Sequence, residues 1–159
     1  MKASKVYLTL FLFILVGAFL RLWNIGFQHM NWDEEWTINF ASPALGPIGL
    51  IVQSLTTDCN TPLYYLFAQL SMVINGATAE AIRYPSAIAG ILLIPAMYLV
   101  GRKYKDELFG LLLAGFTTVF YNFVFYSKFG RSYAFELLFF ALTFGFFIQA
   151  MRGDRKSKY

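Results

Sequence analysis

The sequence predicts an all-α integral membrane protein, and three observations support this prediction. The 159 residues are 58% hydrophobic and only 14% charged, with a mean hydropathy of +0.55, which is too apolar for a water-soluble domain of this length. The 18 Phe and 10 Tyr residues lie within or at the ends of long apolar runs, as expected beside lipid tails and headgroups. The basic residues form short clusters between these runs, which indicates membrane topology and argues against nucleic-acid binding.

Four apolar runs are long enough to cross a bilayer, which requires about 17 to 25 residues in a helix. They cover residues 6–23, 84–101, 108–127 and 133–151. A shorter run at about 62–75 contains Gln69 and Ser71, so we expect an interfacial or re-entrant helix there. Residues 1–159 would then form a single transmembrane module in which residues 24–83 are one long outer loop.

The distribution of Lys and Arg tests this number of spans, because basic residues in short loops are retained on the cytoplasmic side. With four spans and an inside N-terminus, nine of the 13 basic residues lie inside, namely Lys2, Lys5, Arg102, Lys103, Lys105, Arg152, Arg155, Lys156 and Lys158. A five-span arrangement leaves inside only Lys2, Lys5, Arg83, Lys128 and Arg131. We therefore expect a multi-pass protein of the cell membrane with both termini in the cytoplasm.

The first run resembles a signal peptide, but no small-residue cleavage pattern follows it. Arg21, Leu22 and Trp23 at its end are typical of an anchor at the membrane interface, which favours a retained span.

Three consecutive acids, Asp33, Glu34 and Glu35, follow the first span and are bracketed by Trp32 and Trp36. Burial at the membrane boundary raises the pKa of a carboxyl group, which suits a general base. A solvated acidic loop between two interfacial tryptophans explains the same pattern.

Cations and a further acid are expected on the same outer side. Arg83 opens the second span, where a side chain that extends to the lipid headgroups explains the motif equally well. Lys128 and Arg131 share a short loop between the third and fourth spans, where they could bind a phosphate. Glu136 lies one turn inside the last span, where an unpaired charge costs about 2.5 to 3.5 kcal/mol, so it needs a function or an ion pair, for example with Arg131.

Other catalytic classes find no support in the sequence. The only histidine is His29, which excludes a credible Ser-His-Asp set, and no zinc-ligand spacing or phosphate-binding glycine loop is present. Asn60 or Thr61 can cap a helix that starts at Pro62, and a helix start alone is the favoured explanation of this motif.

Four of these motifs occur in an order that resembles the N-terminal half of the GT-C glycosyltransferases. The resemblance is to glycosyltransferase family 39, which includes protein O-mannosyltransferases and the aminoarabinose transferases that modify lipid A. The matching segments are Asp33-Glu34, the Pro-Leu-Tyr-Tyr helix start at residues 62–65 that contains Tyr64, Arg83 to Ser86, and Tyr126 to Arg131. A second Asp, found in some relatives two residues after the last Arg, is replaced here by Tyr133.

The resemblance implies an inverting transfer of sugar from a polyprenyl-phosphate donor to an acceptor protein or glycolipid on the outer face. Asp33 would be the general base, and Glu34 would hold the acceptor or a divalent cation. Arg131, Lys128 and Arg83 would bind the donor phosphate, with Glu35, Tyr64, Tyr133 and Glu136 in support. The family has more spans, which implies a missing C-terminal half or a further membrane subunit. The alternative is a non-catalytic four-span protein that binds polyprenyl phosphate or scaffolds a membrane complex.

Overall fold

The computed structural model describes residues 3–57 and 61–156, and within these ranges it contains helices and no strands. This confirms the predicted all-α class. The elements are α1 (Ala3–Leu22), α2 (Trp32–Phe40), the 3₁₀ turn η1 (Pro43–Leu45), α3 (Gly46–Thr57), α4 (Pro62–Asn75), α5 (Ala79–Tyr104), α6 (Glu107–Val119), α7 (Tyr121–Ser127) and α8 (Tyr133–Lys156).

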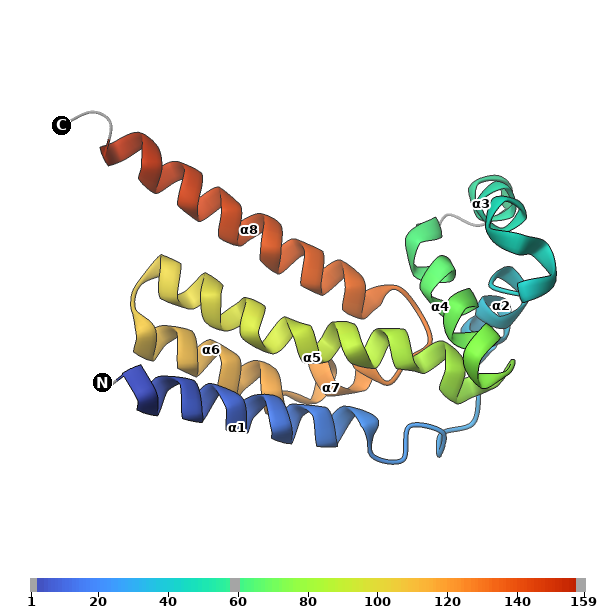
Figure 1. Ribbon diagram of the computed structural model, residues 1–159, viewed down its shortest axis with the longest axis horizontal. Coiled ribbons are helices and arrows are strands. Elements are labelled where there is room, and N and C mark those ends of the chain that lie inside the picture. Colours follow the sequence, from blue (N-terminus) through green and yellow to red (C-terminus); the bar gives the residue numbers. More distant parts are fainter. Residues whose placement is uncertain (1–2, 58–60, 157–159) are drawn as a thin grey trace.

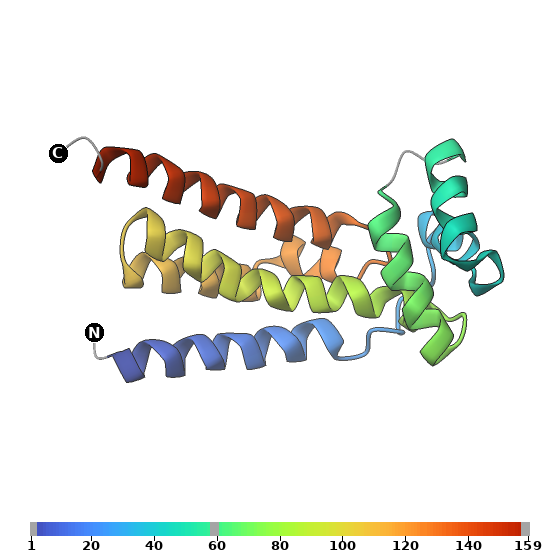
Figure 2. The same ribbon diagram turned by 45° about the horizontal axis from the view of Figure 1, so that its top comes forward.

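The helices form two groups (Figure 1). The helices α1, α5, α6 and α8 run along the long axis of the molecule, whereas α2, α3 and α4 gather at one end of it, in the view of Figure 2 as well. The first residues of α1 and the last turns of α8 are both at the opposite end, with α5 and α6 between them. Helix α5 is the central element. In its apolar 18-residue stretch 61% is buried, compared with 17% in that of α1.

Several helices are long and apolar enough to cross a membrane. The stretches Ser4–Leu22, Ala79–Tyr104 and Tyr133–Arg152 meet this criterion, and α6 and α7 meet it as a bent pair. The stretch Trp32–Thr57 also meets it, but it consists of α2, η1 and α3, which lie at the end of the bundle rather than alongside it. Which helices span the bilayer, and the four-span module of residues 1–159, remain predictions.

Local sequence explains how the long helices start and pack. Thr78 caps α5 by accepting a hydrogen bond from the Ala81 N–H (3.2 Å), and Asp106 caps α6 through the Phe109 N–H (2.8 Å). Where α5 and α6 cross, a Cβ on Gly101 would lie 2.7 Å from the Gly110 Cα, so glycine is needed there. Such small residues let membrane helices approach closely. Thr61 precedes α4 without a side-chain cap, and Asn60, the other expected cap, lies outside the described residues.

Two features differ from the sequence-based expectations. The apolar run at residues 108–127 is two helices, because Phe120 has an extended backbone (φ −63°, ψ 125°) and α6 and α7 meet at a bend of 59°. Arg21 is fully buried rather than interfacial, so its expected role as an anchor is wrong, whereas Trp23 is 66% exposed.

Candidate functional site

A buried ion pair connects α2 to α5 at the end of the bundle where α4 lies. The Glu34 carboxylate accepts hydrogen bonds from Arg83 Nε (2.6 Å) and Nη2 (2.7 Å), and both side chains are at most 1% exposed. Arg83 also donates to the carbonyl oxygens of Ile25 (2.9 Å) and Gln28 (3.0 Å), in the segment after α1. This paired, multiply hydrogen-bonded geometry is the one in which buried charges are tolerated. Glu34 and Arg83 therefore hold three segments together.

The loop between α7 and α8, residues 128–132, is attached to the same pair through its main chain. The Gly130 N–H donates to Glu34 Oε1 (2.7 Å), and the Gly130 carbonyl accepts from Thr37 Oγ1 (2.9 Å). The Arg131 carbonyl accepts from Ser86 Oγ (2.9 Å). These bonds fix the loop against α2 and α5 and thereby fix the position of the Arg131 backbone.

The loop geometry brings Arg131 to the acidic segment. Arg131 Nη1 lies 3.1 Å from the Tyr65 hydroxyl and 3.4 Å from the Asp33 carbonyl oxygen. Arg131 lines a cavity of about 180 Å³ together with Trp36, Phe40 and Thr57. The Asp33 side chain is exposed, and its main-chain carbonyl oxygen is the group that Arg131 contacts. An exposed carboxylate and a guanidinium on contacting segments are the kinds of group that deprotonating a hydroxyl and binding a phosphate would need.

Two aromatic residues that line this cavity, Trp36 and Phe40, belong to a longer row of ring contacts. Trp32, Trp36, Phe40 and Tyr65 are in successive ring contact, with centroid separations of 6.4, 5.7 and 5.7 Å. Trp36 is 45% exposed, whereas Phe40 and Tyr65 are buried. Apolar walls with a few convergent polar groups are typical of a small-molecule site. Phe40 belonged to no motif in the sequence, and Tyr65 was expected only as part of the helix start at residues 62–65. Tyr65 lies on the buried stripe of α4 with Tyr64, Ala68, Gln69 and Met72.

One other expected cation, Lys128, and two expected acids, Glu35 and Glu136, do not line this cavity. Lys128 Nζ donates to the Trp23 carbonyl oxygen (2.7 Å), and burial, with the nearby positive charge of Arg83, lowers the pKa of Lys128 below its ordinary value. Glu35 is exposed on α2. Glu136 accepts a hydrogen bond from Ser132 (2.6 Å) and, within the described residues, forms no ion pair with Arg131, so that alternative is wrong.

The two tyrosines expected to support the site are placed differently from each other. Tyr64 is buried and its hydroxyl donates to the Ile82 carbonyl oxygen (2.7 Å), and burial raises the pKa of this hydroxyl. Tyr133 lines a separate cavity of about 520 Å³ with Tyr126 and Glu136. Neither hydroxyl contributes to the cavity beside Arg131.

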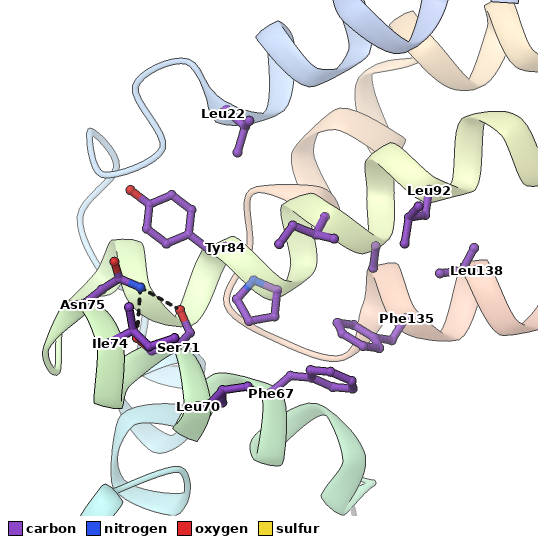
Figure 3. Close-up of a pocket in the computed structure, with 13 residues that line it drawn as sticks. Leu22, Phe67, Leu70, Ser71, Ile74, Asn75, Tyr84, Leu92, Phe135 and Leu138 are labelled. Carbon is purple, nitrogen blue, oxygen red and sulfur yellow. Dashed lines mark hydrogen bonds between the residues drawn. The ribbon is translucent and has the colours of Figure 1, made fainter. Parts of the chain in front are cut away.

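A third cavity, of about 650 Å³, opens between α1, α4, α5 and α8. Figure 3 shows its lining, in which Ser71, Asn75 and Tyr84 lie together at one side and the remaining labelled side chains are apolar. Phe135 lines this cavity and contacts the ring of Tyr64, the neighbour of Tyr65, at 5.6 Å. Two aromatic side chains thus lie between this apolar space and the hydroxyl that contacts Arg131.

The described residues do not suggest how a metal ion would be held. In residues 3–57 and 61–156, no three His, Cys, Asp or Glu side chains group together as ligands. Both oxygens of Glu34 already accept hydrogen bonds, from Arg83, from Gly130 and from the Asn31 N–H (3.2 Å). Glu34 is therefore unsuited to the role of cation ligand.

One known protein family matches a large part of this chain. Residues 59–159, about two thirds of the chain, match the model of the dolichyl-phosphate-mannose-protein mannosyltransferase family. The chain belongs to this family. Neither the curated proteins nor the solved structures contain a match. Membership in the dolichyl-phosphate-mannose-protein mannosyltransferase family confirms the GT-C resemblance and, with the apolar helices, a multi-pass membrane protein of a glycosyltransferase family. The matched segment includes Arg83, Lys128 and Arg131, whereas Asp33 and Glu34 precede it.

Proposed function

We propose that this chain carries the site at which a sugar is transferred from a polyprenyl-phosphate donor to a hydroxyl group on the extracytoplasmic face. The observation that carries the proposal is the contact of the Arg131 guanidinium with the main-chain carbonyl oxygen of Asp33, at a cavity that Trp36 and Phe40 also line. The description of the family names dolichyl-phosphate mannose as donor and protein as acceptor, and we propose these classes for this chain.

In the proposed step, the Asp33 carboxylate takes the proton of the acceptor hydroxyl. The acceptor oxygen attacks the anomeric carbon while the bond from that carbon to the phosphate oxygen breaks. The polyprenyl phosphate leaves with the bonding electrons, so the configuration is inverted. The guanidinium of Arg131 stabilises the charge that develops on the phosphate, with Lys128 contributing charge from the same loop.

The remaining residues support this step without taking part in it. Glu34 and Arg83 are assigned a positioning role, because they bond to each other and Glu34 accepts from the main chain of the loop that carries Arg131. The apolar cavity behind Phe135 would accommodate part of the hydrocarbon chain of the donor. The cluster of α2, α3 and α4 would face outward and both termini would lie in the cytoplasm.

The test is sugar transfer by the chain in its native membrane, with labelled dolichyl-phosphate mannose and a serine- and threonine-containing peptide. We expect Asp33→Asn to reduce transfer by about 10² to 10⁴, the contribution of a general base, with donor binding unchanged. The matched control is Glu35→Gln, which removes an exposed acid two residues away and should leave transfer near the original rate. Transfer at the original rate by Asp33→Asn would exclude Asp33 as the base.

A second measurement separates binding from chemistry. Arg131→Ala should weaken the binding of polyprenyl phosphate, whereas Asp33→Asn should not. If Arg131→Ala weakens binding but no variant, nor the original chain, transfers sugar, the non-catalytic lipid-binding alternative is correct.

A further inference from the structure

Arg21 is a fully buried cation near the end of α1, and its neighbours are polar but uncharged. Its guanidinium donates to Ser127 Oγ from Nε (3.2 Å) and to the carbonyl oxygens of Thr118 (3.2 Å) and Gly17 (3.2 Å) from Nη1. Nη2 donates to the Thr117 carbonyl oxygen (2.8 Å). Among pairs in which both residues are described, Arg83 and Glu34 form the one ion pair, so Arg21 has no carboxylate partner among the described residues. A charge placed this way inside a membrane protein requires a specific function.

The two threonine carbonyls explain why a cation is needed at this point. In a continuous helix, the carbonyls of Thr117 and Thr118 would accept from the amides four residues later, at positions 121 and 122. Those amides belong to α7, beyond the extended Phe120 and the 59° bend. Carbonyl groups without donors are strongly disfavoured away from water. Arg21 supplies the missing donors, and it thereby caps the broken end of α6.

Two glycines make room for the guanidinium. A Cβ on Gly90 of α5 would lie 1.9 Å from Ser127 Oγ and 3.0 Å from Arg21 Nε. A Cβ on Gly17 of α1 would lie 3.2 Å from Arg21 Nη1 and 2.2 Å from Ile94 Cδ1. Arg21 is therefore the point at which α1, α5, α6 and α7 meet.

The same contacts lead directly to the loop that carries Arg131. Ser127, which accepts from Arg21, is the last residue of α7, and the loop begins at the next residue with Lys128 bonded to Trp23. We infer that Arg21 is a positioning residue for phosphate binding: it fixes the break between α6 and α7, so that Arg131 lies beside Asp33. This inference rests on the proposed function, because it assigns the phosphate to Arg131.

The test is a double-mutant cycle between Arg21 and Arg131, with polyprenyl phosphate binding to the full chain in lipid nanodiscs as the readout. Arg21→Met should weaken binding by about ten-fold or more, and it should have little further effect when Arg131 is already alanine, because residues that act through one contact are not additive. The control is Arg102→Met, which replaces an exposed arginine near the end of α5 and should change nothing. Independent, additive losses would overturn the inference.

A second readout separates this inference from the proposed function. Spin labels at Leu12 on α1 and Tyr126 on α7, both partly exposed, report how firmly α7 is held. Arg21→Met should broaden the distribution of distances between these labels, and Arg102→Met should not. If Arg131→Ala leaves phosphate binding intact, the proposed function fails, and this distance measurement still tests whether Arg21 fixes the break. An unchanged distribution would refute that role.

A milder variant covers the case in which Arg21→Met does not fold. Ser127→Ala removes the acceptor of Nε, together with the hydrogen bond that Ser127 Oγ donates to the Phe123 carbonyl oxygen within α7, and it leaves the charge of Arg21 in place. It should weaken polyprenyl phosphate binding by a few-fold, again with little further effect in the Arg131→Ala background. Unchanged binding by a folded Ser127→Ala protein would contradict the inference that Arg21 positions the loop through its bond to Ser127 at the end of α7.

Discussion

Replacing Glu34 by Gln tests whether this acid stabilises the fold or is available to a ligand. Glu34 accepts four hydrogen bonds, two from Arg83 (2.6 and 2.7 Å) and one each from Gly130 (2.7 Å) and Asn31 (3.2 Å). Gln has nearly the same shape, but it carries no charge and only one oxygen. Its NH₂ group would replace the second carboxylate oxygen, and it would face donor groups whose hydrogen bonds that oxygen now accepts.

The expected loss of stability follows from this count. Removing one partner of a buried ion pair costs about 3 to 5 kcal/mol, because the other charge stays buried without compensation. Gln still accepts from the groups around one oxygen, so the lower end applies, about 3 kcal/mol. That corresponds to roughly a hundred-fold change in the unfolding equilibrium.

The assay is equilibrium unfolding in mixed micelles titrated with a denaturing detergent, followed by tryptophan fluorescence. Glu35→Gln is the control, since an exposed substitution should stay within about 0.5 kcal/mol. The double variant Glu34→Leu with Arg83→Met should lose less than the sum of the two single variants, because apolar side chains of similar volume can replace a buried pair. A loss below about 1 kcal/mol for Glu34→Gln would refute the structural role and return Glu34 to the set of candidate ligands.

Two further predictions concern the loop of residues 128–132. Gly130→Ala should destabilise the protein by about 1 to 3 kcal/mol in the same titration, because its Cβ would lie 2.6 Å from Ile82 Cδ1 and 3.0 Å from Glu34 Oε1. The control Gly49→Ala, whose Cβ would lie 3.6 Å from Leu45 Cβ, should be neutral or stabilising, and equal effects at both positions would contradict the packing argument. The lowered pKa of Lys128 means that this lysine loses its proton at lower pH than an ordinary lysine, so phosphate binding should weaken early as pH rises. Lys128→Arg should retain binding at alkaline pH, since arginine stays charged, and identical pH profiles would exclude Lys128 as a contributor.

The sequence was sufficient to predict the all-α membrane class, because long apolar runs have few other structural solutions. It could not predict the break at Phe120, since residues 108–127 read as one continuous run. The carbonyl groups just before the break accept hydrogen bonds from Arg21, which lies almost a hundred residues away in the chain. The sequence-based expectation for Arg21 was wrong as well, because an arginine at the end of a span usually lies at the membrane interface.

The candidate site was predicted only in part. Sequence order alone suggested that Asp33 and Arg131 face the same side, and the structure places Arg131 against the Asp33 main chain. The three acids 33 to 35 could not be separated by sequence, since adjacent residues on a helix point in different directions. The helical turn buries Glu34 while Asp33 and Glu35 stay exposed. Lys128 and Arg131 diverge because the loop turns between them.

The loop of residues 128–132 is attached to the scaffold largely through peptide groups, with Gly130 and Arg131 bonded to Glu34, Thr37 and Ser86. Such an attachment does not depend on which side chain occupies position 131. Evolution or an engineer could therefore exchange that side chain for another and alter headgroup preference without rebuilding the framework that presents it. Under the proposed function, an attempt to change the lipid specificity would begin at that position.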